Sequence, residues 1–157
     1  LQLLLREQVS VKQLALVLET LGDYAARTKD PVLLTEYVRH RLARQICTRY
    51  RDRDNQLRVV AIDPALEDRI RAGFEHNERG LFVRMSPQAV EATCNAIASE
   101  LTKLTTANHT PIILVSPQIR AAVKQITENH LPNLVVLSFN EITRDTQIVT
   151  VGLAADS

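Results

Sequence analysis

The start of the chain carries apolar side chains at intervals of three and four. This spacing predicts an amphipathic helix whose apolar face is formed by Leu14, Leu18 and Leu21. Ser10 precedes the repeat and Gln13 follows three positions later, which is the spacing of a capping box, so Ser10 is the expected N-cap. Gly22 and the polar run at 27–30 end this helix.

A second helix is predicted from Pro31 to about Tyr50. Apolar side chains recur there at every fourth position, at Leu34, Val38, Leu42 and Ile46. The segment 51–56 that follows is polar and turn-like. We therefore expect a boundary at this point, with a helical part at 1–54 and a second part at 55–157.

Beyond this boundary the pattern alternates between strands and helices. Short apolar runs typical of strands stand at 57–62, 81–85, 111–115 and 134–138, and a half-exposed edge strand is expected at 146–152. The helical repeats between them have apolar faces formed by Leu66, Ile70 and Phe74, by Val90, Cys94, Ile97, Leu101 and Leu104, and by Ile119, Val123 and Ile126. Such crossovers join parallel strands. The expected fold class is therefore α+β/α/β, an N-terminal helical segment followed by a small α/β subdomain with a mixed, partly parallel sheet.

Four predicted helices start with Asp or Ser followed by proline. The side chain of the first residue can accept a hydrogen bond from a free backbone N–H, and proline fits the first helical position. Helix starts can also bind anions. However, none of the four glycines stands in a strand-to-helix turn, and no glycine-rich phosphate motif is present. We therefore interpret the four residues as structural N-caps: Asp30, Asp63, Ser86 and Ser116.

Composition and charge exclude several classes of function. The chain has 157 residues, enough for one full domain or for one domain with a helical appendage, and its 45% hydrophobic and 24% charged residues are typical of a globular protein. An aromatic content of 4% and a net charge of +1 argue against nucleic-acid binding. Cys47 and Cys94 are far apart, as in a reduced cytosolic protein, and Cys94 is expected in the core. The chain begins within a helical pattern, so we expect it to be a piece of a longer protein.

The sequence contains no recognisable catalytic or metal-binding constellation. The segment 74–78 is interpreted as a solvated helix end. Ser86 and Ser116 have no local base that would make them nucleophiles. No other ligand-like spacing involves the histidines His40, His76, His109 and His130. We therefore expect no enzymatic activity, no cofactor and no metal.

Arginines crowd the end of the second predicted helix and the segment after it. Arg41 and Arg44 are one turn apart and can share a face. Two interpretations remain open, a solvated face partly paired with nearby carboxylates, or a protein–protein contact in which arginine binds carboxylates. The residues concerned are Arg39, Arg41, Arg44, Arg49, Arg51 and Arg53.

Two long strings resemble one known family. The string LLREQVSVKQLALVLETLGDYAARTKDPVLLTEYVRHRLARQI at 4–46 resembles the cytoplasmic region of the flagellar type III export-gate family, the FlhA family. The string PIILVSPQIRAAVKQITENHLPNLVVLSFNEI at 111–142 is similar to the terminal subdomain of that region. Injectisome counterparts of the SctV or InvA type share both strings. The segments 27–31 and 43–46 resemble the flagellar branch more closely.

The resemblance implies a non-enzymatic part of a bacterial protein export gate. It implies a membrane domain outside this chain and a cytoplasmic domain of several subdomains that assembles as a nonameric ring at the cytoplasmic face of the inner membrane. The chain would supply the end of the third subdomain at 1–54 and the fourth at 55–157. The implied partners are export chaperones with their cargo and the cytoplasmic ATPase complex.

Ring contacts in this family involve the third subdomain, so five basic residues become candidates for a contact with a neighbouring subunit or a partner. They are Arg27, Lys29, Arg39, Arg41 and Arg44. The alternatives are the same part of an injectisome gate, or, from another class, a small-ligand-binding α/β regulatory domain or enzyme that uses the Ser/Asp-Pro helix starts.

Overall fold

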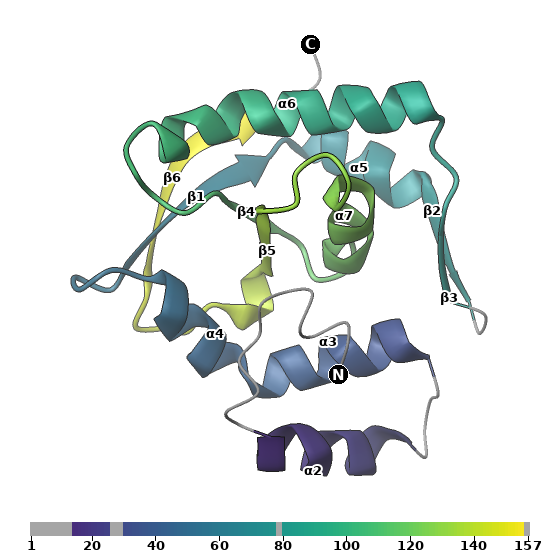
Figure 1. Ribbon diagram of the computed structural model, residues 1–157, viewed down its shortest axis with the longest axis vertical. Coiled ribbons are helices and arrows are strands. Elements are labelled where there is room, and N and C mark those ends of the chain that lie inside the picture. The colour runs from purple at the N-terminus through teal and green to yellow at the C-terminus, as the bar shows by residue number, and fades with distance from the viewer. Residues whose placement is uncertain (1–13, 26–29, 78–79, 156–157) are drawn as a thin grey trace.

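A four-stranded sheet lies between two layers of helices in the computed structural model of the protein, which describes residues 14–25, 30–77 and 80–155 (Figure 1). The strand order is β5-β4-β1-β6 and every neighbouring pair is parallel. The strands are β1 (Gln56–Ile62), β4 (Ile112–Val115), β5 (Val135–Ser138) and β6 (Gln147–Ala154). β6 is an edge strand with several exposed residues, which confirms the edge strand expected from the alternating pattern.

The two layers of helices cover opposite faces of this sheet (Figure 1). Leu57 and Val59 of β1 point to the face covered by α2 (Leu14–Ala25), α3 (Pro31–Arg41) and α4 (Ala43–Tyr50). Val60 and Ile62 point to the face covered by α5 (Pro64–Ala72), α6 (Pro87–Thr105) and α7 (Arg120–Thr127). The alternation along β1 thus places one apolar cluster on each side of the sheet.

One of the two clusters joins the helical part to the sheet. It combines Val17, Val38, Leu42 and Ile46 of the helices with sheet residues that include Leu57, Leu114 and Leu137. The helical and α/β parts therefore share a hydrophobic core on this face. The boundary between 54 and 55 stays a prediction, and the shared core means that neither part buries its apolar surface alone.

The second predicted helix is in fact two helices. Leu42 leaves the helical conformation, with φ −95° and ψ 13°, and its N–H donates to the carbonyls of Val38 and Arg39. These bonds close a tight turn, after which α4 runs in another direction (Figure 1). Leu42 and Ile46 both remain buried, so the apolar spacing is kept while the helix axis changes.

An antiparallel hairpin replaces two sequence-based expectations. Phe74, predicted on a helix, starts β2 (Phe74–Asn77), and the expected helix end at 74–78 is wrong. The run predicted as a sheet strand at 81–85 forms β3 (Gly80–Val83), which pairs with β2 and not with the main sheet. The helix α5 ends at its C-cap Gly73, whose N–H donates to the Ile70 carbonyl, and β3 begins at Gly80, whose φ of 124° favours glycine.

Three of the described Ser/Asp-Pro sites have capping geometry. The side chains of Asp30, Asp63 and Ser86 accept hydrogen bonds from the N–H groups of residues 32, 65 and 89, at 3.0, 3.1 and 3.1 Å. Ser116 was expected to do the same, and this is wrong. Residues 117–119 form a turn, α7 begins only at Arg120, and the Ser116 hydroxyl donates to the Glu67 carboxylate. Ser10, with its expected cap, lies outside the described residues.

The shared core generates a stability prediction. Leu137 is fully buried between the sheet and α2–α4, so Leu137→Ala is expected to lower the free energy of unfolding by about 2–5 kcal/mol. Leu18 on α2 is 55% exposed, and Leu18→Ala should change the free energy of unfolding by less than about 0.5 kcal/mol. Urea unfolding followed by circular dichroism measures both. Equal effects would contradict the shared core.

Candidate functional site

Four charged side chains meet where α3 and α7 reach the end of β5. Arg39 Nε donates to Glu141 Oε2 at 2.8 Å, and Arg120 donates from Nε and Nη2 to the two carboxylate oxygens of Glu36, at 2.6 and 2.7 Å. Glu36 and Arg39 lie on α3, Arg120 begins α7, and Glu141 ends the short 3-10 helix η2 (Phe139–Glu141). We call these four residues the buried charge cluster.

The cluster is neutral and almost closed to water. The side chains of Arg39, Arg120 and Glu141 are 3–4% exposed, and Glu36 is 25% exposed. Burial raises the pKa of Glu141, but the charges of Arg39 and Arg120 and the hydrogen bonds from Arg39 and the Ser138 N–H lower it more, so the pKa lies below its ordinary value. Glu141 is therefore an ionised carboxylate that binds Arg39 and is also stabilised by the charge of Arg120.

The burial of Arg39 corrects one predicted contact residue. Its guanidinium also donates to the carbonyl of Val136 at 3.3 Å. A side chain that is 4% exposed and committed to these acceptors has no surface to offer a neighbouring subunit. Arg39 joins α3 to η2, and the sequence missed its partner Glu141 because no spacing pattern links the two residues.

Arg41 and Arg44, by contrast, lie on the surface. The Arg41 side chain is 43% exposed and lies 3.4 Å from Asp23, and the Arg44 side chain is 69% exposed and lies 3.9 Å from Asp145. These long, exposed pairs leave both guanidinium groups accessible. Arg27 and Lys29, the other predicted contacts, lie outside the described residues.

Asp145 anchors the loop before β6 to the end of α4. Arg51 Nη1 lies 3.2 Å from its carboxylate and 3.0 Å from the Thr146 hydroxyl. Hydrogen bonds from the Thr143 and Arg51 side chains lower the pKa of Asp145 to about 2. Arg51 therefore links the end of α4 to the loop before β6, while Arg41 and Arg44 keep accessible charges.

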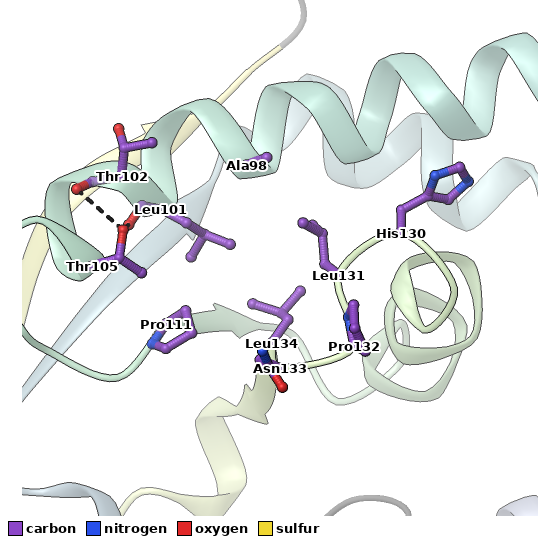
Figure 2. A pocket seen from close by; sticks show the side chains of 10 residues that line it. All are labelled: Ala98, Leu101, Thr102, Thr105, Pro111, His130, Leu131, Pro132, Asn133 and Leu134. Atoms are coloured by element: carbon purple, nitrogen blue, oxygen red, sulfur yellow. Dashed lines mark hydrogen bonds between the residues drawn. The ribbon is translucent and has the colours of Figure 1, made fainter.

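A small hollow lies between the second half of α6 and the loop that leads into β5 (Figure 2). Its volume is about 250 Å³, which suits one apolar side chain better than a metabolite. Leu101, Leu131 and Leu134 point into it, and His130 and Asn133 lie at its rim (Figure 2). No carboxylate, lysine or arginine lines it, so the hollow offers no charge to a nucleotide or an organic acid.

Within the described part of the chain, no group of three or more His, Cys, Asp or Glu is placed to bind a metal ion. Cys94 is buried, as expected, and donates its S–H to the Ile126 carbonyl at 3.4 Å, while burial raises its pKa. His76 pairs with Asp30 and ties the hairpin to the start of α3. Among the described helices, none combines the length and the apolar composition needed to cross a membrane.

Comparisons with known proteins agree on one family. The family model described as the FHIPEP family matches residues 1–147. The flagellar biosynthesis protein FlhA of Bacillus subtilis is 36% identical over 150 residues, and the invasion protein InvA of Salmonella typhimurium is 35% identical over 151 residues. Each match covers 96% of this chain and 22% of the relative, so the chain spans less than a quarter of the length of these proteins.

Solved structures show the same fold. The CdsV protein of Chlamydia pneumoniae matches with a TM-score of 0.87 and 28% identity, over 98% of this chain and 44% of that one. The nonameric SctV-C of EPEC matches with a TM-score of 0.80 and 31% identity, over 97% and 45%. CdsV in its complex with CdsO matches with a TM-score of 0.85 and 30% identity, over 97% and 44%.

The buried charge cluster generates a second prediction. Glu141→Gln keeps the shape of the side chain but leaves the buried Arg39 without its counter-charge, while Arg120 keeps Glu36, so it should lower the free energy of unfolding by about 3–5 kcal/mol. Asp23→Asn breaks the exposed pair with Arg41 and should cost at most about 1 kcal/mol. Denaturant unfolding of both variants is the measurement. A Glu141→Gln effect as small as that of Asp23→Asn would contradict the cluster's role.

The lowered pKa of Asp145 predicts a pH dependence. A carboxyl whose pKa is lower in the folded protein stabilises it above the unfolded pKa, and the effect is lost as the pH falls through the folded pKa. Wild type and Asp145→Asn should therefore differ in melting temperature at pH 6, with wild type higher, and the difference should shrink between about pH 4 and pH 2. A difference that does not change with pH would contradict the ion pair with Arg51.

Proposed function

Because the chain belongs to the FHIPEP family, we propose that it is the C-terminal cytosolic part of the export gate of a type III protein secretion system. The single observation that carries the proposal is the match of nearly the whole chain to FlhA and InvA and to the fold of SctV-C. We place the protein in the flagellar branch on the segments 27–31 and 43–46, with an injectisome gate as the alternative. The two identities, 36% and 35%, do not separate these branches.

In this proposal the chain is a binding platform and not an enzyme. The helical part at 1–54 corresponds to the end of the third cytosolic subdomain and the α/β part at 55–157 to the fourth. The shared core and the buried charge cluster support a platform in which both parts act together. The full protein carries this platform at the cytoplasmic face of the bacterial inner membrane.

We propose a nonameric ring as the working assembly, since the related SctV-C is nonameric. Arg41 and Arg44 support a ring contact on the α3–α4 surface, because both are exposed and only loosely paired within the chain. A carboxylate of a neighbouring copy can replace Asp23 or Asp145 as the acceptor with better, bidentate geometry.

Partner binding is the second element of the proposal. Export chaperones with their cargo and the cytoplasmic ATPase complex are the partners, and the complex of the related CdsV with CdsO supports the binding of other proteins to this part of the gate. The hollow beside α6 suits one apolar side chain of such a protein.

The function is tested in the source bacterium by deleting the full-length gene and restoring it on a plasmid. Swimming, secreted flagellin and secreted effectors are measured before and after restoration. Loss of flagellin alone supports the flagellar gate, and loss of effectors alone supports the injectisome gate. Unchanged export of both kinds of protein contradicts the proposal.

The ring contact generates a fourth prediction. Arg41→Glu combined with Arg44→Glu should reduce export at least tenfold and lower the yield of cross-linked oligomers of the full-length protein, because like charges then face each other across the contact. Arg84→Glu is the control, since the Arg84 side chain is 71% exposed, similar to Arg44, and lies on the other part of the molecule. Immunoblots establish equal amounts of protein. Normal export and oligomers in the double variant remove these residues as contacts.

A further inference from the structure

The two edges of the parallel sheet differ in whether side chains bind their outward backbone groups. At the β5 edge, the Val136 carbonyl accepts hydrogen bonds from Arg39 and Arg120, at 3.3 and 3.2 Å, and the Leu134 carbonyl accepts one from Lys124 at 3.3 Å. Three cations thus cover the free carbonyls of that edge. At the other edge, β6 pairs only with β1 among the residues described.

The backbone of β6 directs hydrogen-bonding groups outward. The Gln147 N–H donates to the Asn55 carbonyl at 2.7 Å, and the Ala154 carbonyl accepts from the Asp63 N–H at 2.8 Å, so both residues face β1. In a parallel strand, successive residues turn their N–H and C=O groups to opposite sides. Ile148 and Thr150 therefore face the open edge. A bulge at Val151 shifts the register, and beyond it Leu153 faces outward.

The side chains of β6 include none of the residue types that prevent a further strand from pairing with an edge. Natural edge strands are protected by charged residues or proline, and the eight residues of β6, QIVTVGLA, include neither. Ile148 and Leu153 are 39% and 47% exposed. They pair with Leu57 and Ala61 of β1 and so lie on the face that α2–α4 cover over the centre of the sheet but leave open at β6 (Figure 1).

We propose that the β6 edge binds an extended peptide segment of another protein, which adds to the sheet as a fifth strand. On the open face its side chains would lie beside Ile148 and Leu153, which favours apolar residues at every second position. On the other face, the Glu100–Lys103 ion pair of α6 lies over Gly152, which favours polar residues in between. The bound segment is thus uncharged in its centre, with alternating apolar and polar residues.

The dimensions of the edge favour a peptide over a second copy of the chain. Stable interfaces between folded proteins bury about 1,200–2,000 Å². Eight strand residues extend over about 26 Å, and a contact one strand wide and that long is too narrow to bury such an area between two folded surfaces. An extended peptide, in contrast, can form backbone hydrogen bonds along the whole of β6 and place side chains on both faces of the sheet.

The test uses a fluorescent peptide, Lys-Thr-Val-Thr-Val-Thr-Val-Thr-Lys, blocked at both ends, and fluorescence anisotropy with the 157-residue chain. Saturable binding is expected. Thr150→Pro removes an outward N–H without removing a bond to β1, and it should weaken binding at least tenfold. Thr150→Val keeps the N–H and should bind as wild type does. Ile148→Lys, which adds a charge to the edge, should also weaken binding at least fivefold.

Circular dichroism checks that each variant is folded, and Ile148→Lys keeps the test decisive if Thr150→Pro unfolds. A peptide with N-methylated valines, which cannot complete the ladder, should bind at least tenfold more weakly. Two binding results would overturn the proposal: no binding at millimolar peptide, or equal binding by wild type and the edge variants. A third would be a dimer of the wild-type chain in sedimentation that Ile148→Lys dissociates, because β6 would then be occupied by a second copy.

Discussion

The fold depends on the pairing of four charges in a place that water barely reaches. An unpaired charge there would cost several kcal/mol, so Arg39, Arg120, Glu36 and Glu141 are stable only as a set. The set in turn fixes the position of each element that supplies it. Arg39 and Glu36 hold α3 against the start of α7 and the end of β5, across 102 and 84 positions of the chain. Hydrophobic packing gives this region its stability, and the charges select one arrangement of the helices on the sheet.

The same arginines determine which side of the sheet is open. By donating to the Val136 carbonyl, Arg39 and Arg120 occupy the acceptor that a further strand would need at β5. Among the residues described, the outward N–H and C=O groups of β6 have no such cover, and this is the edge at which we propose that a strand is added. The hydrogen bonds that stabilise the buried arginines thus also cover the β5 edge, and the two edges of the sheet differ for this reason.

Periodicity predicted the elements whose structure depends on their own residues. The apolar faces of α6 and α7, the strands of the parallel sheet and the edge position of β6 all follow from spacing. Predictions from spacing were wrong where contacts between residues far apart in the sequence determine the structure. Arg39 is adjacent to Val38 and looked like a surface residue, because its acceptor Glu141 is 102 positions away. Ser116 has the sequence of a cap, but Glu67 engages its hydroxyl and the helix starts later. The run at 81–85 has the composition of a sheet strand, and nothing in its spacing shows that it pairs with residues 74–77 and not with the main sheet.

Joining the two parts has a consequence for how the protein can respond to partners. Segments on either side of a flexible boundary can rotate about it, but here a shared apolar cluster and a buried charge cluster both cross the boundary that the sequence predicts at 54. Rotation would have to expose the apolar residues and separate the charges at the same time, so low-energy motion about this boundary is not expected. The α3–α4 surface with Arg41 and Arg44 therefore keeps a fixed orientation to β6 and to the hollow beside α6. In the ring that we propose, a partner that moves the α/β part therefore also moves the α3–α4 surface, without any change of conformation within the chain.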